Sequence, residues 1–161
     1  MADKKDILSL TSKELEAIIV SEMSEKKFRA KQIFDWLHVK KVSDFSDMTN
    51  ISADLRTKLD EKFCIKCLNI VQKLESSIDN TVKYLYGLDD GNIVEAVVME
   101  YSFGLSICIS TQIGCKMGCD FCASAIAGFI RNLDSSEILL QKYEAERNLG
   151  KKISREIGRA S

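Results

Sequence analysis

Three cysteines stand close together in the segment QIGCKMGCDFC, at positions Cys115, Cys119 and Cys122. Their C-x3-C-x2-C spacing allows three thiolates of a single loop to bind three irons of one cubic iron–sulfur cluster. The fourth iron of such a cluster has no protein ligand and is open to a small molecule. Gly114 and Gly118 permit the tight backbone path that this loop needs. The triplet therefore predicts a 4Fe-4S cluster site on these three cysteines.

Two other interpretations of the cysteines compete with this one. The CIKC pair, Cys64 and Cys67, could join two triplet cysteines in a zinc site, but the pairs lie much further apart than the ~15 to 20 residues of compact zinc ribbons. Cysteines that only fill a core are common, and this interpretation suits Cys64 and Cys67 better than the triplet. In a reducing compartment, cysteines in this number indicate metal or redox chemistry more than structural disulfides.

Length and composition limit the class of protein. The 161 residues, 45% hydrophobic and 29% charged, are typical of a folded protein with one domain, or one small domain and part of another. A complete enzyme barrel does not fit this length. We expect a cytoplasmic protein without a membrane partner, because no apolar run reaches the ~18 residues of a membrane span and the charged start is unlike a secretion signal. The net charge of -1 gives no electrostatic indication of nucleic-acid binding.

Apolar residues recur at helical spacing in the first part of the chain. Three short amphipathic helices are expected, over about 12–22, 28–37 and 53–63. Ser12 and Ser52 are the expected N-caps of the first and third helices. Phe34 and Trp36 are expected in the core, since they recur with the other apolar residues of the second helix. We interpret residues 1–63 as a small N-terminal helical module.

After Cys67 the apolar pattern changes to the alternation of β-strands. Val82, Tyr84 and Tyr86 are expected on one face of a sheet. The sequence DDG that follows is typical of a hairpin turn. We interpret residues 64–103 as a β-meander that connects the helical module to the rest of the chain.

The cysteine loop is expected between a strand and a helix. A strand pattern covers 105–111, and a helix pattern opens at one of residues 134–136, has Glu137 in its first turn and ends at Gly150. This order is that of a β-α unit. We interpret residues 104–161 as the start of an α/β core, so the expected fold class is α+β leading into α/β.

The triplet, with Phe121 before its last cysteine, resembles the signature of the radical S-adenosylmethionine superfamily. The segments FRAKQIFDWLHVKKVSDFSDMTNISADLRTKL, DDGNIVEAVVMEY and CISTQIGCKMGCDFCASAIAGFIRNLDSSEILLQ resemble the bacterial RNA adenine-C2 methyltransferases. This resemblance covers nearly all of residues 8–154. It implies a radical-SAM partial (β/α) barrel, S-adenosyl-L-methionine bound at the fourth iron, a reducing electron donor, and ribosomal RNA and tRNA as substrates. We expect a monomer.

The resemblance also implies a reaction and two further site residues. In that family a protein cysteine is methylated first, a radical then takes hydrogen from its methyl group, and the carbon adds to adenine. A second thiol releases the product by attacking the methylated cysteine, and a disulfide bond forms. Cys108 falls at the position of that second thiol, and Glu95 at that of the acidic proton acceptor. From the residues alone, Cys108 is interpreted as a buried strand cysteine and Glu95 as a solvated strand residue.

The family pattern extends beyond this sequence. Further strand–helix units, a Gly-Glu-Pro segment and a C-terminal methyl-carrying cysteine are absent, and the polar end KKISREIGRAS departs from the family after about Ser154. We therefore expect a truncated barrel in which Ile107 and Ile109 lack packing partners. We also expect this chain to be inactive on its own.

Two alternative functions remain open. The related adenine-C8 methyltransferases are implied to use the same cluster and similar cysteines, and no residue here separates C2 from C8. The other alternative is a non-catalytic RNA-binding remnant, in which lysines such as Lys26, Lys27 and Lys31 contact phosphates. Acidic residues balance these lysines, so a solvated face is the competing interpretation.

Overall fold

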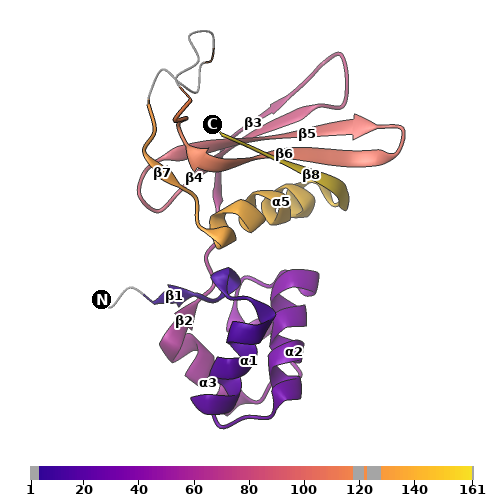
Figure 1. Cartoon of the computed structure of the whole chain (residues 1–161). Coiled ribbons are helices and arrows are strands. Elements are labelled where there is room, and N and C mark those ends of the chain that lie inside the picture. Colours follow the sequence, from indigo (N-terminus) through magenta and orange to yellow (C-terminus); the bar gives the residue numbers. More distant parts are fainter. Residues whose placement is uncertain (1–3, 118–121, 123–127, 161) are drawn as a thin grey trace. The chain divides into compact units, whose positions relative to one another are not determined.

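The structure, a computed structural model, describes residues 4–117, 122 and 128–160. The chain divides into two compact units, Met1–Cys67 and Leu68–Ser161 (Figure 1). The strands of the expected connecting segment and those of the expected core lie in one sheet within the second unit. Among the described residues, no helix combines the length and apolar character needed to cross a membrane.

The first unit is helical, as expected. Its elements are β1 (Lys5–Asp6), η1 (Ile7–Ser9), α1 (Ser12–Ser21), α2 (Lys27–Asp35), η2 (Trp36–Lys40), η3 (Phe45–Asp47), α3 (Ala53–Lys62) and β2 (Phe63–Cys64). The short strands β1 and β2 pair in parallel, which joins the beginning and the end of the unit. Its core consists of fully buried side chains from all three helices, including Leu15, Ile33 and Leu59. Burial of these apolar side chains stabilises helices that are too short to persist alone in water.

The ends of the helices differ in detail from the expectation. Thr11, and not Ser12, caps α1: its hydroxyl accepts from the Glu14 amide, and the Glu14 carboxylate accepts from the Thr11 amide at 2.8 Å. Ser52 stands at the N-cap of α3 without a capping hydrogen bond from its side chain. Trp36 is only half-buried, because its indole N–H donates to Asn50 at 2.5 Å at the edge of the unit. Phe34 is half-buried too, so the expected core position of both rings is wrong.

In its described residues, the second unit consists of a six-stranded sheet and one long helix. Its elements are β3 (Asn69–Glu75), β4 (Val82–Gly87), β5 (Ile93–Tyr101), β6 (Gly104–Ile113), β7 (Arg131–Asn132), α5 (Ser135–Leu149) and β8 (Ile153–Ala160). Strands β3 to β7 pair antiparallel in chain order, and β8 pairs in parallel with β6. The expected meander is therefore confirmed. The unit β6–α5–β8 adds a parallel strand where the polar end of the chain was expected to lose the pattern.

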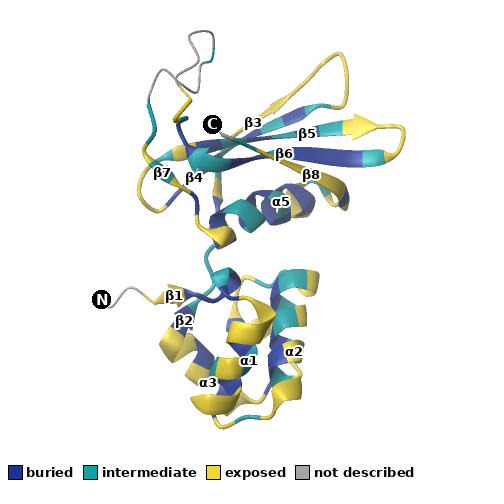
Figure 2. Ribbon diagram, in the orientation of Figure 1, coloured by how far each residue is buried: buried dark blue, intermediate teal, exposed yellow. Residues whose placement is uncertain are grey.

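Helix α5 covers one face of this sheet (Figure 2). Val82, Tyr84 and Tyr86 alternate onto the covered face and are buried, as expected. Ile107 and Ile109 are 0% and 4% exposed, so the expectation that they lack packing partners is wrong. The reason is that α5 packs on β6 and β8 pairs along its edge, which together cover both residues.

Candidate cluster loop and adjoining sheet face

The cysteine loop leaves and re-enters the sheet through a narrow neck. Strand β6 ends at Ile113, and the returning strand β7 pairs with it, with the Ile130 amide donating to the Ile113 carbonyl at 2.9 Å. The backbones of Gly114 and Gly128 touch at this point: a Cβ on Gly114 would lie 1.6 Å from the Gly128 carbonyl oxygen. Gly114 also has a φ of +70°, which side-chain-bearing residues rarely adopt. Only glycine fits at Gly114, as the sequence indicated.

Two of the three predicted cluster ligands are described. Cys115 follows the neck directly, and both Cys115 and Cys122 are half-buried without a disulfide. The amide of Met117 points at Cys115 Sγ, 3.5 Å away. Hydrogen bonds of this kind to cysteine sulfur accompany iron–sulfur ligation and tune the cluster. Cys115 and Cys122 supply thiol donors of the kind that iron–sulfur clusters use, while Cys119 and Phe121 lie outside the described residues.

Cys108 and Glu95 lie on the sheet face opposite α5. Cys108 pairs with Val97 across β5 and β6, and Glu95 is two residues from Val97, so all three side chains point to the same side. We call this side the open face and define it by Lys83, Leu85, Glu95, Val97 and Cys108, all half-buried. Cys108 is therefore not the buried strand cysteine that the residues alone indicated. The covered and open faces alternate along the same strands.

Glu95 is held by two cations on the open face. Its carboxylate forms ion pairs with Lys83 from β4 and Arg159 from β8, and its side chain is 26% exposed. Burial works to raise the pKa of Glu95, but the hydrogen bonds and charges of Lys83 and Arg159 outweigh it and lower the pKa below its ordinary value. Glu95 is therefore an ionised carboxylate at neutral pH. It is more constrained than the solvated residue of the sequence interpretation.

Ser110 of β6 lies beyond the end of the β5–β6 pairing, and Gln141 of α5 forms hydrogen bonds with its backbone. The pairing of β5 with β6 ends at Val97 and Cys108. Beyond it, the Gln141 amide group of α5 accepts from the Ser110 N–H at 2.8 Å and donates to the Ser110 carbonyl at 2.9 Å. The Ser110 hydroxyl donates to the Glu95 carbonyl at 2.6 Å. Gln141 is fully buried and replaces the missing strand partner, a role that the helical pattern around it gave no means to predict.

The CIKC pair does not behave as a buried packing pair. Cys67 is exposed and Cys64 is half-buried, with its thiol donating to the Lys4 carbonyl at 3.3 Å. Within the described ranges, no three His, Cys, Asp or Glu side chains are grouped to hold a metal ion. The five described cysteines are free of disulfides. The zinc alternative also needs Cys119, which lies outside those ranges.

Comparisons with known proteins match this arrangement over nearly the whole chain. Residues 5–65 match the family described as Ribosomal RNA large subunit methyltransferase N-terminal domain. The chain is 50% identical over 154 residues to the probable dual-specificity RNA methyltransferase RlmN of Lachnoclostridium phytofermentans. It is 51% identical over 150 residues to that of Clostridium novyi. Over nearly its whole length the chain is similar to the N-terminal portion of RlmN proteins.

The matches cover most of this chain and less than half of each relative. They take in 96% and 93% of the chain but 43% of each RlmN protein. A crystal structure of a radical SAM methyltransferase from Sphaerobacter thermophilus matches with a TM-score of 0.81 and 29% identity, over 96% of this chain and 47% of that chain. The resemblance inferred from the sequence segments is therefore confirmed for the N-terminal portion of RlmN.

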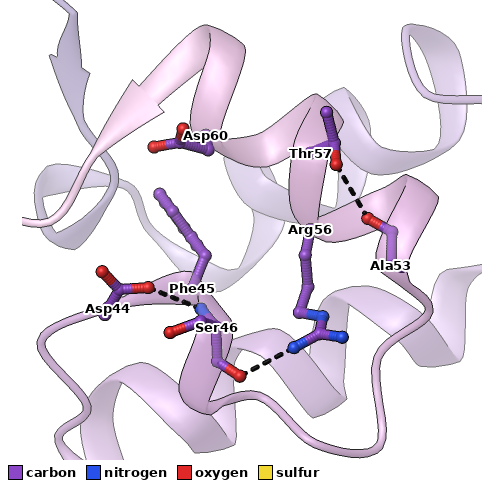
Figure 3. Close-up of a pocket in the computed structure, with 7 residues that line it drawn as sticks. All are labelled: Asp44, Phe45, Ser46, Ala53, Arg56, Thr57 and Asp60. Atoms are coloured by element: carbon purple, nitrogen blue, oxygen red, sulfur yellow. Dashed lines mark hydrogen bonds between the residues drawn. The ribbon is translucent and has the colours of Figure 1, made fainter.

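The family match over residues 5–65 corresponds to the helical unit, which has a shallow cavity of about 350 Å³ near α3 (Figure 3). Its polar groups bond mainly to one another. The Asp44 carboxylate accepts from the Ser46 amide at 2.6 Å, which contributes to lowering the pKa of Asp44, and Arg56 donates to the Ser46 carbonyl at 2.7 Å (Figure 3). Thr57 donates to the Ala53 carbonyl. These local contacts explain the cavity as a feature of the fold.

Two ring–cation pairs of the helical unit lie on α2 and η2. Phe28 is 51% exposed with the Arg29 guanidinium 4.9 Å from its ring centre, and the Lys40 ammonium lies 3.3 Å from the centre of the Trp36 ring. Lys27 pairs with Glu16 at 2.9 Å, so part of the basic charge is balanced locally. Cations beside accessible rings are typical of surfaces that stack on nucleic-acid bases.

Proposed function

We propose that this chain supplies the cluster loop and the adjoining reactive sheet face of an RNA adenine-C2 methyltransferase. One observation carries the proposal: a single strand, β6, bears Cys108 on the open face beside Glu95 and runs directly into the neck of the cysteine loop. In α/β proteins, reactive groups gather where parallel strands end and loops begin. The order β6–α5–β8 supports the start of a partial barrel.

Cys115, Cys119 and Cys122 would hold the 4Fe-4S cluster. When bound, that cluster supplies the electron that cleaves S-adenosyl-L-methionine to a radical, after reduction by an electron donor. Among the described residues, the chain contributes Cys115 directly after the Gly114–Gly128 contact, with the Met117 amide directed at Cys115 Sγ. Hydrogen bonds to cluster sulfur and the degree of solvent exposure set the reduction potential of such sites.

Cys108 and Glu95 would act on the methylated adenine intermediate. We assign the Cys108 thiol as the group that attacks the methylated cysteine elsewhere in the protein, and the Glu95 carboxylate as the proton acceptor. The two ion pairs keep Glu95 ionised at neutral pH, so its carboxylate is in the form that can accept a proton. Half-burial gives the Cys108 thiol access to a partner above the open face.

Ribosomal RNA and tRNA are the substrates we propose, because the matched relatives carry the name dual-specificity RNA methyltransferase. The rings and cations of α2 and η2 are candidate contacts to the RNA. The net charge of -1 means that such contacts would be local and few, so binding should weaken steeply with salt only if several lysines take part.

A chimera tests the proposal. Residues 1–154 of this chain replace the matching portion of the Lachnoclostridium phytofermentans RlmN, and RNA from the reaction is analysed by mass spectrometry against C2- and C8-methyladenosine standards. We expect C2-methyladenosine from the chimera, none from residues 1–161 alone, and loss of product with Cys108→Ala or Glu95→Gln. A matched control is Cys67→Ala, which removes an exposed cysteine of the first unit.

Each other outcome has a definite meaning. C8-methyladenosine would assign the sister activity. An inactive chimera that still binds RNA would favour the non-catalytic remnant. Full activity of the Cys108→Ala chimera would remove Cys108 from the proposed reaction.

A further inference from the structure

Arg131 lies at the exit of the cysteine loop and binds two carboxylates at once. Its Nη1 and Nη2 donate to the two carboxylate oxygens of Glu137 at 2.7 and 2.8 Å, and its Nε donates to Asp90 Oδ2 at 2.7 Å. Paired parallel hydrogen bonds between a guanidinium and a carboxylate fix direction as well as distance. The exit strand β7 is thus tied down by its own first residue.

The two carboxylates belong to separate parts of the unit. Glu137 is in the first turn of α5, its side chain is 7% exposed, and its Oε2 also accepts from the Asp134 amide at 2.8 Å. Asp90 lies in the turn between β4 and β5, where its Oδ1 accepts from the Asn92 amide at 3.0 Å. Both anchors are therefore held by their own backbone contacts before Arg131 reaches them.

The contacts of Arg131 with Asp90 and Glu137, which we call the tether, lie beside the narrow neck of the loop. Arg131 pairs with Ile113 across β6 and β7, next to the contact between Gly114 and Gly128. The entry and exit of the loop are consequently fixed to each other and, through Arg131, to α5 and the β4–β5 turn. An untethered loop would lose far more conformational entropy when its cysteines gather around one ligand.

We propose that Arg131 is a positioning residue for the cluster: it holds the exit of the cysteine loop in register with its entry, so that cysteines along the loop bind one cluster. This inference rests on the proposed cluster site. It assigns a role to Arg131, Asp90 and Glu137, none of which is a predicted cluster ligand. Partners of this kind behind metal ligands typically change metal affinity by ~10- to 100-fold when removed.

The test is cluster retention in the full chain of residues 1–161. Wild type, Arg131→Ala and Arg131→Lys are reconstituted anaerobically with iron and sulfide, and cluster loss to an iron chelator is followed by visible absorption, with electron paramagnetic resonance of the reduced form. We expect ~10-fold faster loss for Arg131→Ala and an altered spectrum. Arg131→Lys keeps one charge but not the paired hydrogen bonds, so it should fall between the two.

Arg147→Ala is the matched control, because Arg147 forms an ion pair with Glu144 on α5 away from the neck. It should retain the cluster as wild type does. Thermal unfolding of the cluster-free variants separates positioning from general stability: the inference requires that Arg131→Ala loses its cluster faster even where its unfolding temperature stays close to that of Arg147→Ala.

Two further variants keep the test decisive if Arg131→Ala does not fold. Asp90→Asn weakens one tether and leaves the Glu137 contacts in place, and Gly114→Ala opens the neck, with Gly150→Ala as its control at an uncrowded position of positive φ at the end of α5. Both should speed cluster loss, while Gly150→Ala should not. Equal retention by wild type, Arg131→Ala and Asp90→Asn would overturn the inference while leaving the cluster site intact. A wild-type chain that binds no iron would overturn both.

Discussion

The two faces of the second unit's sheet use the same strands for different purposes. Tyr84, Tyr86 and Ile107 on the covered face are fully buried beneath α5, whereas Glu95 and Cys108 on the open face are half-buried and polar or reactive. Alternation along a strand places neighbouring residues on opposite faces. A strand can therefore secure the fold with one residue and present chemistry with the next.

The largest expected effect on stability comes from a substitution on the covered face. Ile107→Ala removes a fully buried side chain of β6 and leaves a cavity beneath α5, so it should lower the free energy of unfolding by about 2 to 5 kcal/mol. Urea denaturation followed by circular dichroism measures this change. A loss below about 1 kcal/mol would mean that α5 does not pack on β6 as described.

A second substitution removes the hydrogen bonds between Gln141 of α5 and the Ser110 backbone of β6. Gln141→Ala leaves the buried Ser110 N–H and carbonyl without their partner, which should cost about 2 to 3 kcal/mol. Gln112→Ala, a half-buried strand glutamine nearby, is the control and should cost much less. Hydrogen exchange of the Ser110 amide should also become faster, and an unchanged rate would contradict the proposed contact.

Glu95 sharpens the comparison through pH. Because its pKa is lowered in the folded state, its contribution to stability is present above the unfolded pKa of about 4.3 and is lost as pH falls through the folded pKa. Glu95→Gln should therefore cost about 1 kcal/mol or less at pH 7, and the difference from wild type should vanish in acid. Removing a cation with Lys83→Met should raise the Glu95 pKa, as measured by carbon-13 NMR. An unchanged Glu95 pKa in the Lys83→Met variant would show that Lys83 does not form an ion pair with Glu95 in solution.

Cys108 should produce the smallest effect on stability. Cys108→Ala on the open face is expected to change the free energy of unfolding by about 0.5 kcal/mol or less, in contrast to the adjacent Ile107→Ala. Alkylation of the Cys108 thiol by a small maleimide should proceed in the folded chain. A protected thiol, or a loss as large as that of Ile107→Ala, would place Cys108 in the core and remove the contrast between the faces.

Local patterns predicted much of this structure, and long-range contacts account for what they missed. The pattern placed the start of α5 at one of residues 134–136, with Glu137 in the first turn and the end at Gly150, and the structure selects Asp134 as the N-cap, because capping depends on residues within one turn. Thr11 displaced Ser12 by a single position, which the neighbouring hydroxyls could not distinguish. The fit of Gly114 against Gly128 agreed with the expected tight path of the loop.

The misses share a physical cause. The polar residues of β8 gave no strand signal, yet pairing along β6 makes them a strand. Gln141 read as an ordinary helix residue because its partner, Ser110, is 31 residues away. Arg131 likewise depends on Asp90, which is brought close only by the sheet. Such contacts are set by tertiary structure and leave no periodic trace in one sequence.

The most direct test of the central claim is anaerobic iron–sulfide reconstitution of residues 1–161 beside a variant in which Cys115, Cys119 and Cys122 are all alanine. Iron counting, visible absorption and low-temperature electron paramagnetic resonance are recorded with and without S-adenosyl-L-methionine. The account predicts a four-iron signal in the wild type that S-adenosyl-L-methionine perturbs and that the variant lacks. A wild-type chain without a cluster, or with one indifferent to S-adenosyl-L-methionine, would contradict it.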